Sequence, residues 1–256
     1  MTLFARYSVL DAAIVGTKKE LALSEVISRV KAGEGGYACF VNAHVSVMTR
    51  QRADVRYAVN TATFAFPDGK PVYLIGKYLD GLDIEKISGP DFMADIFESK
   101  EGRALRHFFY GGTPEVLDRL TSLLVNTYPG ANIVGVISPP FRPLTEKEQL
   151  EHLDVVRASQ AQIVWVGLGA PKQELWMHDY ASSIPQAMFM GVGAAFDFHA
   201  GTLERAPEWA QKWGFEWFYR LIKEPRRLWR RYLTTNSLFI YHALKDRIFR
   251  RPSNSC

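Results

Sequence analysis

The sequence predicts an α/β fold: a mostly parallel, Rossmann-like sheet flanked by helices, followed by a basic, amphipathic, helical C-terminal appendage. Short β-rich runs alternate with amphipathic stretches, the runs end near Gly or Pro, and basic residues gather in the last fifth of the chain. Strands and helices alternating at this rhythm are typical of a parallel sheet covered on both faces. We expect a body over residues 1–204 and a tail over residues 205–256.

The expected strands are short, rich in β-branched or aromatic residues, and bounded by turn residues. They are YACFV (37–41), TFAF (63–66), HFFYG (107–111), NIVGVI (132–137), QIVWVG (162–167) and AMFMGVG (187–193). Such continuous apolar runs indicate strands that are buried on both faces.

Three helices are marked by their first turns. Pro114 follows Thr113 and opens PEVLDRLTSLLVN, which has its apolar residues on one face. Thr145 and Glu148 have the spacing of a capping box at the start of a helix over residues 145–158. Pro171 opens a third helix, PKQELWMHDY.

Composition limits the class of protein. The 256 residues can bury one sizeable core, and 47% hydrophobic with 23% charged residues is typical of a folded chain. Cys39 and Cys256 are the two cysteines, too few for a disulfide scaffold, so we expect a reducing compartment. The sequence shows neither a signal-like start nor an apolar run of about 18 residues, so we expect neither secretion nor a membrane span.

Ligands of parallel sheets bind at the carboxyl ends of the strands, so the residues that follow each strand are candidates. Asp68 follows TFAF and is either a turn aspartate or a general base whose pKa is raised by Phe64 and Phe66. Asn42 follows YACFV and either caps the helix beginning near Ala43 or binds a sugar hydroxyl.

Gly167 and Gly169 precede Pro171 and Lys172, which places backbone N–H groups and a cation at a helix start. The pattern is either a tight turn or an anion site. It lacks the Walker spacing and the third glycine of a dinucleotide fingerprint, which argues against a nicotinamide-dependent oxidoreductase. The GxSxG pattern of serine hydrolases is also missing.

We expect neither a metal site nor a cofactor. The chain contains no Asp-x-Asp, the carboxylate pair that commonly holds a divalent ion against a nucleotide diphosphate, and its histidines lack ligand spacing. Phosphate chemistry must therefore use lysines, arginines and helix dipoles.

The tail carries 12 Lys and Arg against 4 Asp and Glu, a net of +8, whereas the body carries 19 against 23, a net of −4. Four of the six tryptophans also lie in the tail. Its helical spacing fits either a helix packed on the body with a solvated basic face or a membrane-surface helix. A non-catalytic module binding a membrane or polyanion is the alternative function, but charge confined to the tail argues against nucleic acid.

Several stretches occur together in one order. They are FVNAH (40–44), FPDGKPV (66–72), ISGPDFM (87–93), FFYGG (108–112), VGLGAPKQELWM (166–177), MGVGAAFDFHAG (190–201) and RAPEWAQKWGFEWFYRLIKEPRRLWRRYL (205–233). In this combination the chain resembles the bacterial WecG/TagA/CpsF glycosyltransferases, glycosyltransferase family 26. FVNAHVSV further resembles the exopolysaccharide (GumM-like) branch.

The resemblance implies a metal-independent, inverting transfer of a hexose or N-acetylhexosamine from a UDP-sugar to a polyprenyl-diphosphate-linked saccharide. It places the enzyme in polysaccharide biosynthesis, peripheral on the cytoplasmic face of an anionic membrane. Glucose, N-acetylmannosamine and its uronic acid remain open as the sugar, and a homo-oligomer remains open as the assembly. Many members have Thr-x-Asn where this chain has Phe40-Val41-Asn42, and arginine where Lys86 precedes ISG.

By resemblance, the family's general base falls on Asp68, its first polar strand-end residue on Asn42 and its PKQE glutamine on Gln173. We expect an in-line displacement in which Asp68 deprotonates the acceptor. Gln173 and Asp197 would orient the donor, and Lys86 would meet phosphate. The candidates for neutralising the departing UDP are the helix start after Gly169, Lys172, Arg220, Arg226 and Arg227.

Overall fold

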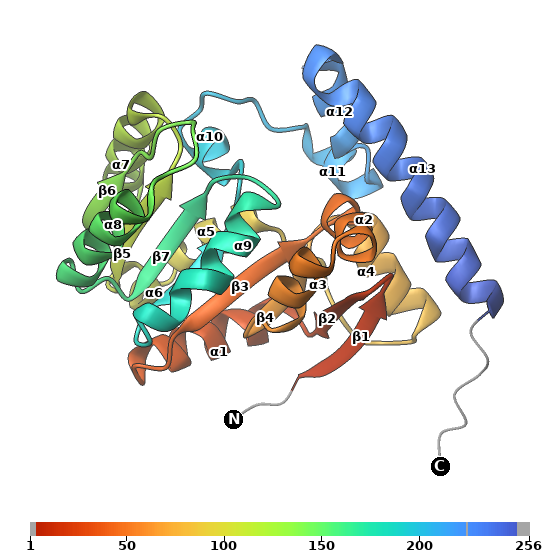
Figure 1. Cartoon of the computed structure of the whole chain (residues 1–256), viewed down its shortest axis with the longest axis horizontal. Coiled ribbons are helices and arrows are strands. Elements are labelled where there is room, and N and C mark those ends of the chain that lie inside the picture. Colours follow the sequence, from red (N-terminus) through yellow and green to blue (C-terminus); the bar gives the residue numbers. More distant parts are fainter. Residues whose placement is uncertain (1–3, 224, 250–256) are drawn as a thin grey trace.

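A computed structural model describes residues 4–223 and 225–249. Its centre is a six-stranded, wholly parallel sheet in the order β4-β3-β8-β7-β5-β6, which confirms the predicted α/β class and all six expected strands (Figure 1). The strands are β3 (Gly36–Val41), β4 (Phe64–Pro67), β5 (Arg106–Gly111), β6 (Asn132–Ile137), β7 (Ile163–Gly167) and β8 (Met188–Gly191).

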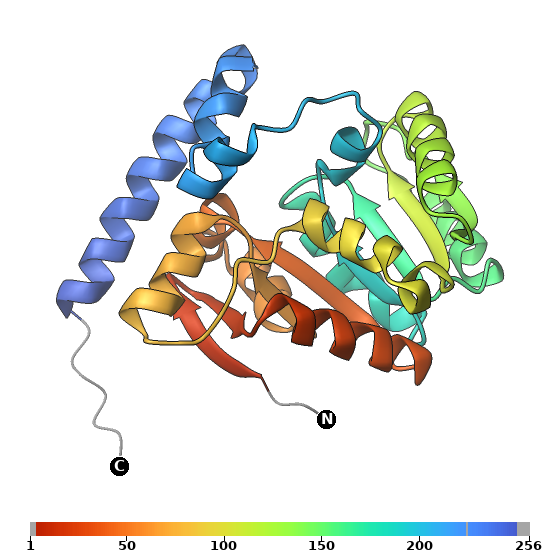
Figure 2. The ribbon, with the colours of Figure 1, turned by 180° about the vertical axis from the view of Figure 1, so that it is seen from behind.

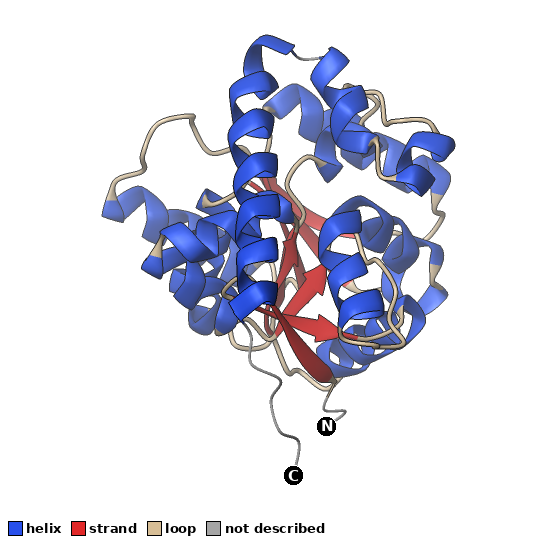
Figure 3. Ribbon diagram, turned by 90° about the vertical axis from the view of Figure 1, so that its right-hand side faces the viewer, coloured by secondary structure: helices blue, strands red, loops and turns tan. Residues whose placement is uncertain are grey.

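Both faces of the sheet are buried along its inner strands. The expectation of a buried strand is wrong for the edge strand β6, none of whose residues is fully buried and where Val136 is 42% exposed. Along β3, Ala38 and Phe40 enter one apolar cluster while Cys39 and Val41 enter the other, because successive side chains of a strand point to opposite faces. Figure 3 shows the sheet between layers of helices. Each buried Val or Phe stabilises the fold by about 1.5–3 kcal/mol relative to exposure.

Helices from separate parts of the chain pack against each face of the sheet. One apolar cluster packs against α2 (Ala43–Gln51), α3 (Ala53–Asn60), α8 (Glu146–Ala158) and α9 (Lys172–Tyr180). The other packs against α1 (Lys19–Lys31), α5 (Gly89–Glu98), α7 (Pro114–Thr127) and α10 (Ala195–His199). Shorter elements are α4 (Lys70–Leu74), the π-helix η1 (Ile75–Leu79), α6 (Lys100–Arg103) and the 3₁₀ turn η2 (Ala181–Ser183). The predicted capping box of Thr145 with Glu148 is confirmed. Thr113, which precedes the predicted first-turn Pro114, caps α7 by accepting from the Val116 N–H.

An N-terminal hairpin was not expected from the sequence. β1 (Ala5–Val9) and β2 (Ala12–Gly16) pair antiparallel, and β2 lies beside β4. Their turn places Leu10 at φ +55°, a conformation that hairpins usually give to Gly or Asn. The Asp11 carboxylate holds the turn by ion pairs with Arg50 and Arg56.

The tail is helical, as predicted, and its last helix packs on the body (Figures 1 and 2). It contains α11 (Glu208–Trp213), α12 (Glu216–Lys223) and α13 (Pro225–Phe249). α13 runs along α2: His44 Nδ1 lies 3.1 Å from Thr235 Oγ1, Arg50 donates to both oxygens of Asp246 at 3.1 and 2.8 Å, and Phe239 is buried. None of the helices in the described residues has the length and apolar character needed to cross a bilayer.

Candidate active site

Asp68 lies directly after β4, at the edge where the parallel strands end. Its backbone N–H donates to the Val41 carbonyl at 2.9 Å, and the Pro67 carbonyl accepts from the Ile87 N–H at 2.9 Å. β3 on one side and the segment before α5 on the other therefore fix its backbone. Phe66, two residues earlier, is fully buried.

Asn42 ends the neighbouring strand and has two roles. Its Oδ1 accepts from the backbone N–H groups of His44 (3.0 Å) and Val45 (3.2 Å), so it caps α2. Its side chain also forms a hydrogen bond with Asp68. Because Oδ1 is engaged by the helix, the amide nitrogen is the donor to the carboxylate. The capping alternative is thus confirmed, and the same side chain reaches the site.

The surroundings of Asp68 perturb its proton affinity. Burial raises the pKa of Asp68 to about 7; the negative charges of Glu216 and Asp91 add to the rise, while Lys86 and the Asn42 hydrogen bond oppose it. A carboxyl group with this pKa can accept and release a proton near neutral pH, as a general base must. A solvated turn aspartate would keep a pKa near 4.

A second carboxylate, in the first turn of α5, behaves in the opposite way. Burial alone would raise the pKa of Asp91, but hydrogen bonds from Arg205 and Ser88, with the charges of Arg205 and Lys86, lower it to about 2. Arg205 Nη1 lies 2.6 Å from Asp91 Oδ1. Two neighbouring carboxyl groups therefore have different tasks: Asp91 stays ionised as an anchor, and Asp68 titrates.

Two members of this cluster come from the tail. Arg205 lies in the connector after α10, and Glu216 is the first residue of α12. The sequence assigned no role to Asp91, Arg205 or Glu216, although all three lie inside quoted motifs. Asp91 and Arg205 are 114 residues apart, so no local pattern joins them.

Turns rich in glycine end the neighbouring strands. A Cβ at Gly111 would lie 2.6 Å from the backbone of Gly167, so the ends of β5 and β7 approach too closely for side chains. Gly169 has φ +76° with open space around it, so its backbone conformation is what requires glycine. The turns after β5 and β7 thus present main chain at the same edge as Asp68.

The three polar residues at the helix start after Gly169 differ in their exposure. Lys172 is exposed, but Gln173 and Glu174 are buried. Gln173 Oε1 accepts from the Gly169 N–H at 3.2 Å, and its Nε2 donates to the Gly191 carbonyl at 2.8 Å and to Glu174 at 3.0 Å. Gln173 therefore ties the turn after β7 to the end of β8, while Lys172 is the residue that offers a charge to solvent.

The remaining predicted site residues lie toward the tail. The Asp197 carbonyl accepts from the N–H groups of Thr202 and Leu203 at 3.0 and 3.1 Å, so this residue shapes the connector from α10. Arg220, Arg226 and Arg227 belong to α12 and α13, but their side chains lie outside the described part of the structure.

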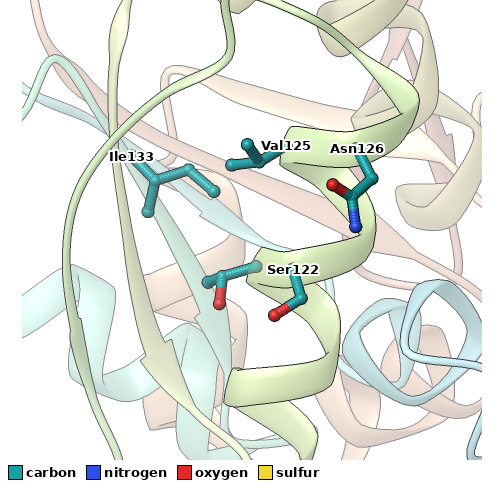
Figure 4. A pocket seen from close by; sticks show the side chains of 5 residues that line it. Ser122, Val125, Asn126 and Ile133 are labelled. Atoms are coloured by element: carbon teal, nitrogen blue, oxygen red, sulfur yellow. The ribbon is translucent and has the colours of Figure 1, made fainter.

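A hollow elsewhere lacks chemistry of this kind. It lies between α7 and β6, away from the Asp68 edge, and Figure 4 shows it lined by uncharged hydroxyl, amide and aliphatic side chains. Its lining residues are Thr121, Ser122, Val125, Asn126 and Ile133. Within residues 4–223 and 225–249, no group of three His, Cys, Asp or Glu side chains could hold a metal ion.

The sequence of the chain matches one known protein family. The model of the glycosyl transferase WecG/TagA/CpsF family matches residues 7–253. The chain belongs to this family. The match includes most of the N-terminal hairpin, the six-stranded sheet and the three tail helices, so the Asp68 cluster and the tail residues that reach it lie within one family unit. Membership in the WecG/TagA/CpsF family identifies the general activity as glycosyl transfer.

Proposed function

We propose that this protein is an inverting glycosyltransferase that moves a hexose or N-acetylhexosamine from a UDP-sugar to a polyprenyl-diphosphate-linked saccharide. The observation that carries the proposal is Asp68, a carboxyl group with a pKa of about 7 at the carboxyl edge of a parallel sheet, next to Asn42 and Lys86. A base of this strength suits deprotonation of an alcohol during attack on a sugar.

The reaction is one displacement at the anomeric carbon. The Asp68 carboxylate takes the proton of the acceptor hydroxyl while its oxygen bonds to the anomeric carbon. The bond from that carbon to the UDP oxygen breaks, and UDP leaves with the electron pair. Attack opposite the leaving group inverts the configuration, and Asp68 then loses its proton to solvent.

Positive groups would neutralise the departing UDP. Lys86 already acts on Asp68 and Asp91, and Lys172 is exposed beside the glycine turn. Arg220, Arg226 and Arg227 are further candidates from the tail. Preorganised charges of this kind stabilise a developing anion without reorganising solvent. Gln173 and Asp197 would support the donor indirectly, by holding the turn and connector that surround it.

The tail supports a lipid-linked acceptor at the cytoplasmic membrane face. α11, α12 and α13 expose large apolar side chains, more than a solvated surface needs. They are Trp209, Trp213, Phe215, Trp217, Phe218, Ile222, Trp229, Leu233, Ile240, Tyr241, Leu244 and Ile248. With the net charge of +8, this surface suits an anionic leaflet.

A non-catalytic membrane-binding module is the second candidate, favoured by the same tail. It gives no reason for a half-buried carboxyl group with a pKa of about 7 on the body. Incubation with UDP-glucose, UDP-N-acetylmannosamine and its uronic acid, with detection of UDP, separates the two candidates. UDP release that requires acceptor supports transfer, and its absence with every donor supports the module.

Asp68→Asn should lower transfer at least about a hundredfold while UDP-sugar binding stays near wild type, because the base acts on the acceptor. Asp118→Asn, on the exposed face of α7, is the matched control and should keep full turnover. Single-turnover transfer and calorimetric donor binding measure the two effects. An Asp68→Asn protein that retains most of its turnover contradicts the assignment.

A further inference from the structure

The start of the tail is fastened to the body beside Asp68. Arg205 Nη1 contacts Asp91 Oδ1 at 2.6 Å, and the Ser88 hydroxyl donates to the other carboxylate oxygen. His199 Nε2 donates to the Pro90 carbonyl at 2.9 Å, one residue before Asp91. The connector is thus joined to the first turn of α5 both before and at Arg205.

A second contact lies on the other side of Asp68. The turn between α11 and α12 rests on Lys70, two residues after the proposed base. A Cβ at Gly214 would lie 2.8 Å from Lys70 Cδ, and the Lys70 ammonium group lies 6.0 Å from the centre of the Trp213 ring. Ala210, in α11, is fully buried. The segment from Arg205 to this turn therefore covers the Asp68 turn.

This arrangement brings Glu216 to the site. It follows Gly214 by two residues and acts electrostatically on both Asp68 and Arg205. The polar and charged groups that act on Asp68 come from four places. They are Asn42 after β3, Lys86 and Asp91 around the start of α5, Arg205 in the connector and Glu216 in α12.

We propose that Arg205 and Glu216 are positioning residues for the proposed transfer. The Arg205–Asp91 ion pair holds the start of the tail over the site, and the docked tail limits the access of water to Asp68 and keeps the Glu216 carboxylate close to it. Asp68 is then a base suited to neutral pH only while the tail is docked. The inference rests on the proposed function for its kinetic arm, but docking itself can be tested without substrate.

The kinetic arm is the pH dependence of kcat/KM with a short-chain, water-soluble acceptor. Glu216→Gln removes a negative charge beside Asp68, so the acid limb should move to lower pH by about half a unit or more. The direction in which Arg205→Gln moves the acid limb distinguishes two possible roles of Arg205. If Arg205 acted merely as a nearby cation, its loss would move the acid limb to higher pH. If Arg205 instead docks the tail, its removal lets water reach Asp68 and lets Glu216 move away from it. Both changes lower the pKa of Asp68 and move the acid limb to lower pH.

Two further variants make the kinetic arm specific. Arg205→Lys keeps a cation that can reach Asp91, so it should restore at least half of the shift seen in Arg205→Gln. Lys223→Gln breaks an exposed ion pair between α12 and the connector, with Glu204 at 2.7 Å, and should leave the limb unmoved. An unmoved or raised limb in Arg205→Gln, or an unmoved limb in Glu216→Gln, overturns the proposal.

The substrate-free arm is limited proteolysis of the full chain by chymotrypsin, which cuts after aromatic residues such as Trp209, Trp213 and Phe215. Arg205→Gln should be cut in this segment several-fold faster than wild type, while Arg205→Lys and Lys223→Gln resemble wild type. Equal cleavage of Arg205→Gln and wild type overturns docking by this ion pair. If the wild type transfers no sugar but is still cleaved more slowly than Arg205→Gln, the proposed function is rejected and docking by this ion pair is retained.

Discussion

At the scale of the residue, the raised pKa that suits Asp68 to the proposed role of base also makes the folded state less stable. Its pKa rises from an ordinary 3.8 to about 7 on folding, so the unfolded chain releases this proton more readily. The folded state therefore loses stability, relative to an uncharged side chain, as pH rises from about 4 to 7, and the loss is constant above 7. Three pKa units correspond to at most about 4 kcal/mol.

We therefore expect Asp68→Asn to stabilise the protein as it removes activity. The gain should be near zero at pH 4, grow through pH 6 and reach a few kcal/mol, about 4 at most, at pH 8. Urea unfolding at fixed pH values measures it, with Asp118→Asn as control. A gain that is the same at pH 4 and pH 8 would show that Asp68 ionises as easily in the folded chain as in the unfolded one.

The number of available carboxylates also decides whether a divalent metal ion could neutralise the departing UDP. Asp91, the anionic neighbour of Asp68, is engaged by Arg205 and Ser88, and the sequence offers no Asp-x-Asp. We expect EDTA to leave turnover unchanged and added Mg²⁺ to do little. Steady-state transfer with and without chelator checks this. About a tenfold loss that a divalent ion restores would assign the leaving-group charge to a metal instead.

At the scale of the element, one side chain joins a helix start to the base. Asn42 caps α2 and bonds to Asp68, so variants can separate the two roles. Asn42→Ala loses the cap and should cost about 1 kcal/mol of unfolding free energy. Asn42→Asp keeps a good cap but puts a carboxylate against Asp68, so the acid limb of the pH profile should move to higher pH.

Thermal or urea unfolding and the pH dependence of kcat/KM give the two readouts for these variants. His44 and Val45 donate to the Asn42 cap and should also donate to a carboxylate in Asn42→Asp, so the free energy of unfolding serves as the internal control. An Asn42→Asp profile with an unmoved acid limb would mean that Asn42 does not contact the catalytic carboxyl group.

Most helices and strands could be predicted because short patterns of neighbouring residues determine them. The strands follow from apolar runs, α7 from Pro114 after Thr113, and α8 from its capping box. The β1–β2 hairpin escaped prediction because its turn places Leu10 at a positive φ without Gly or Asn. The inward direction of Gln173 also escaped, since three polar residues at a helix start do not reveal which of them face the sheet.

At the scale of the whole molecule, the site is assembled from distant segments. Strand ends and their spacing indicated Asp68 and Asn42 because parallel strands end at one edge. The ion pair between Asp91 and Arg205 depends on the path of the tail across that edge of the sheet. The hydrophobic periodicity of the sequence does not predict that path. Because Asp91 has a pKa of about 2 and Asp68 one of about 7, we expect the acid limb of transfer near neutral pH to report Asp68.

The tail sets a final expectation for the whole protein. Each Lys or Arg within a Debye length of about 8 Å of an anionic leaflet contributes about 1 kcal/mol, so half of the +8 suffices for attachment. The protein should sediment with anionic vesicles and not with neutral ones. High salt should weaken binding without abolishing it, because the exposed apolar side chains remain buried in the interface.

Variants of exposed residues test which surface attaches. Trp209 and Ile222 are each 62% exposed on the tail, and changing both to Ser should remove the salt-resistant part of binding. Phe141, in the loop before α8, is 87% exposed, and α8 lies on the other side of the molecule from α12 (Figure 1). Phe141→Ser should therefore bind vesicles like wild type. Equal losses from both changes would place attachment elsewhere.

A last pair of arginines separates attachment from catalysis. Arg226 and Arg227 changed together to Ala should weaken vesicle binding whatever their second role. If they also neutralise UDP, transfer to a short-chain, water-soluble acceptor should fall as well, because that acceptor needs no membrane. Full transfer to the soluble acceptor with loss on the lipid-linked one would confine both arginines to the leaflet. The charge on the leaving UDP would then be met by Lys86, Lys172 and the main chain after Gly169.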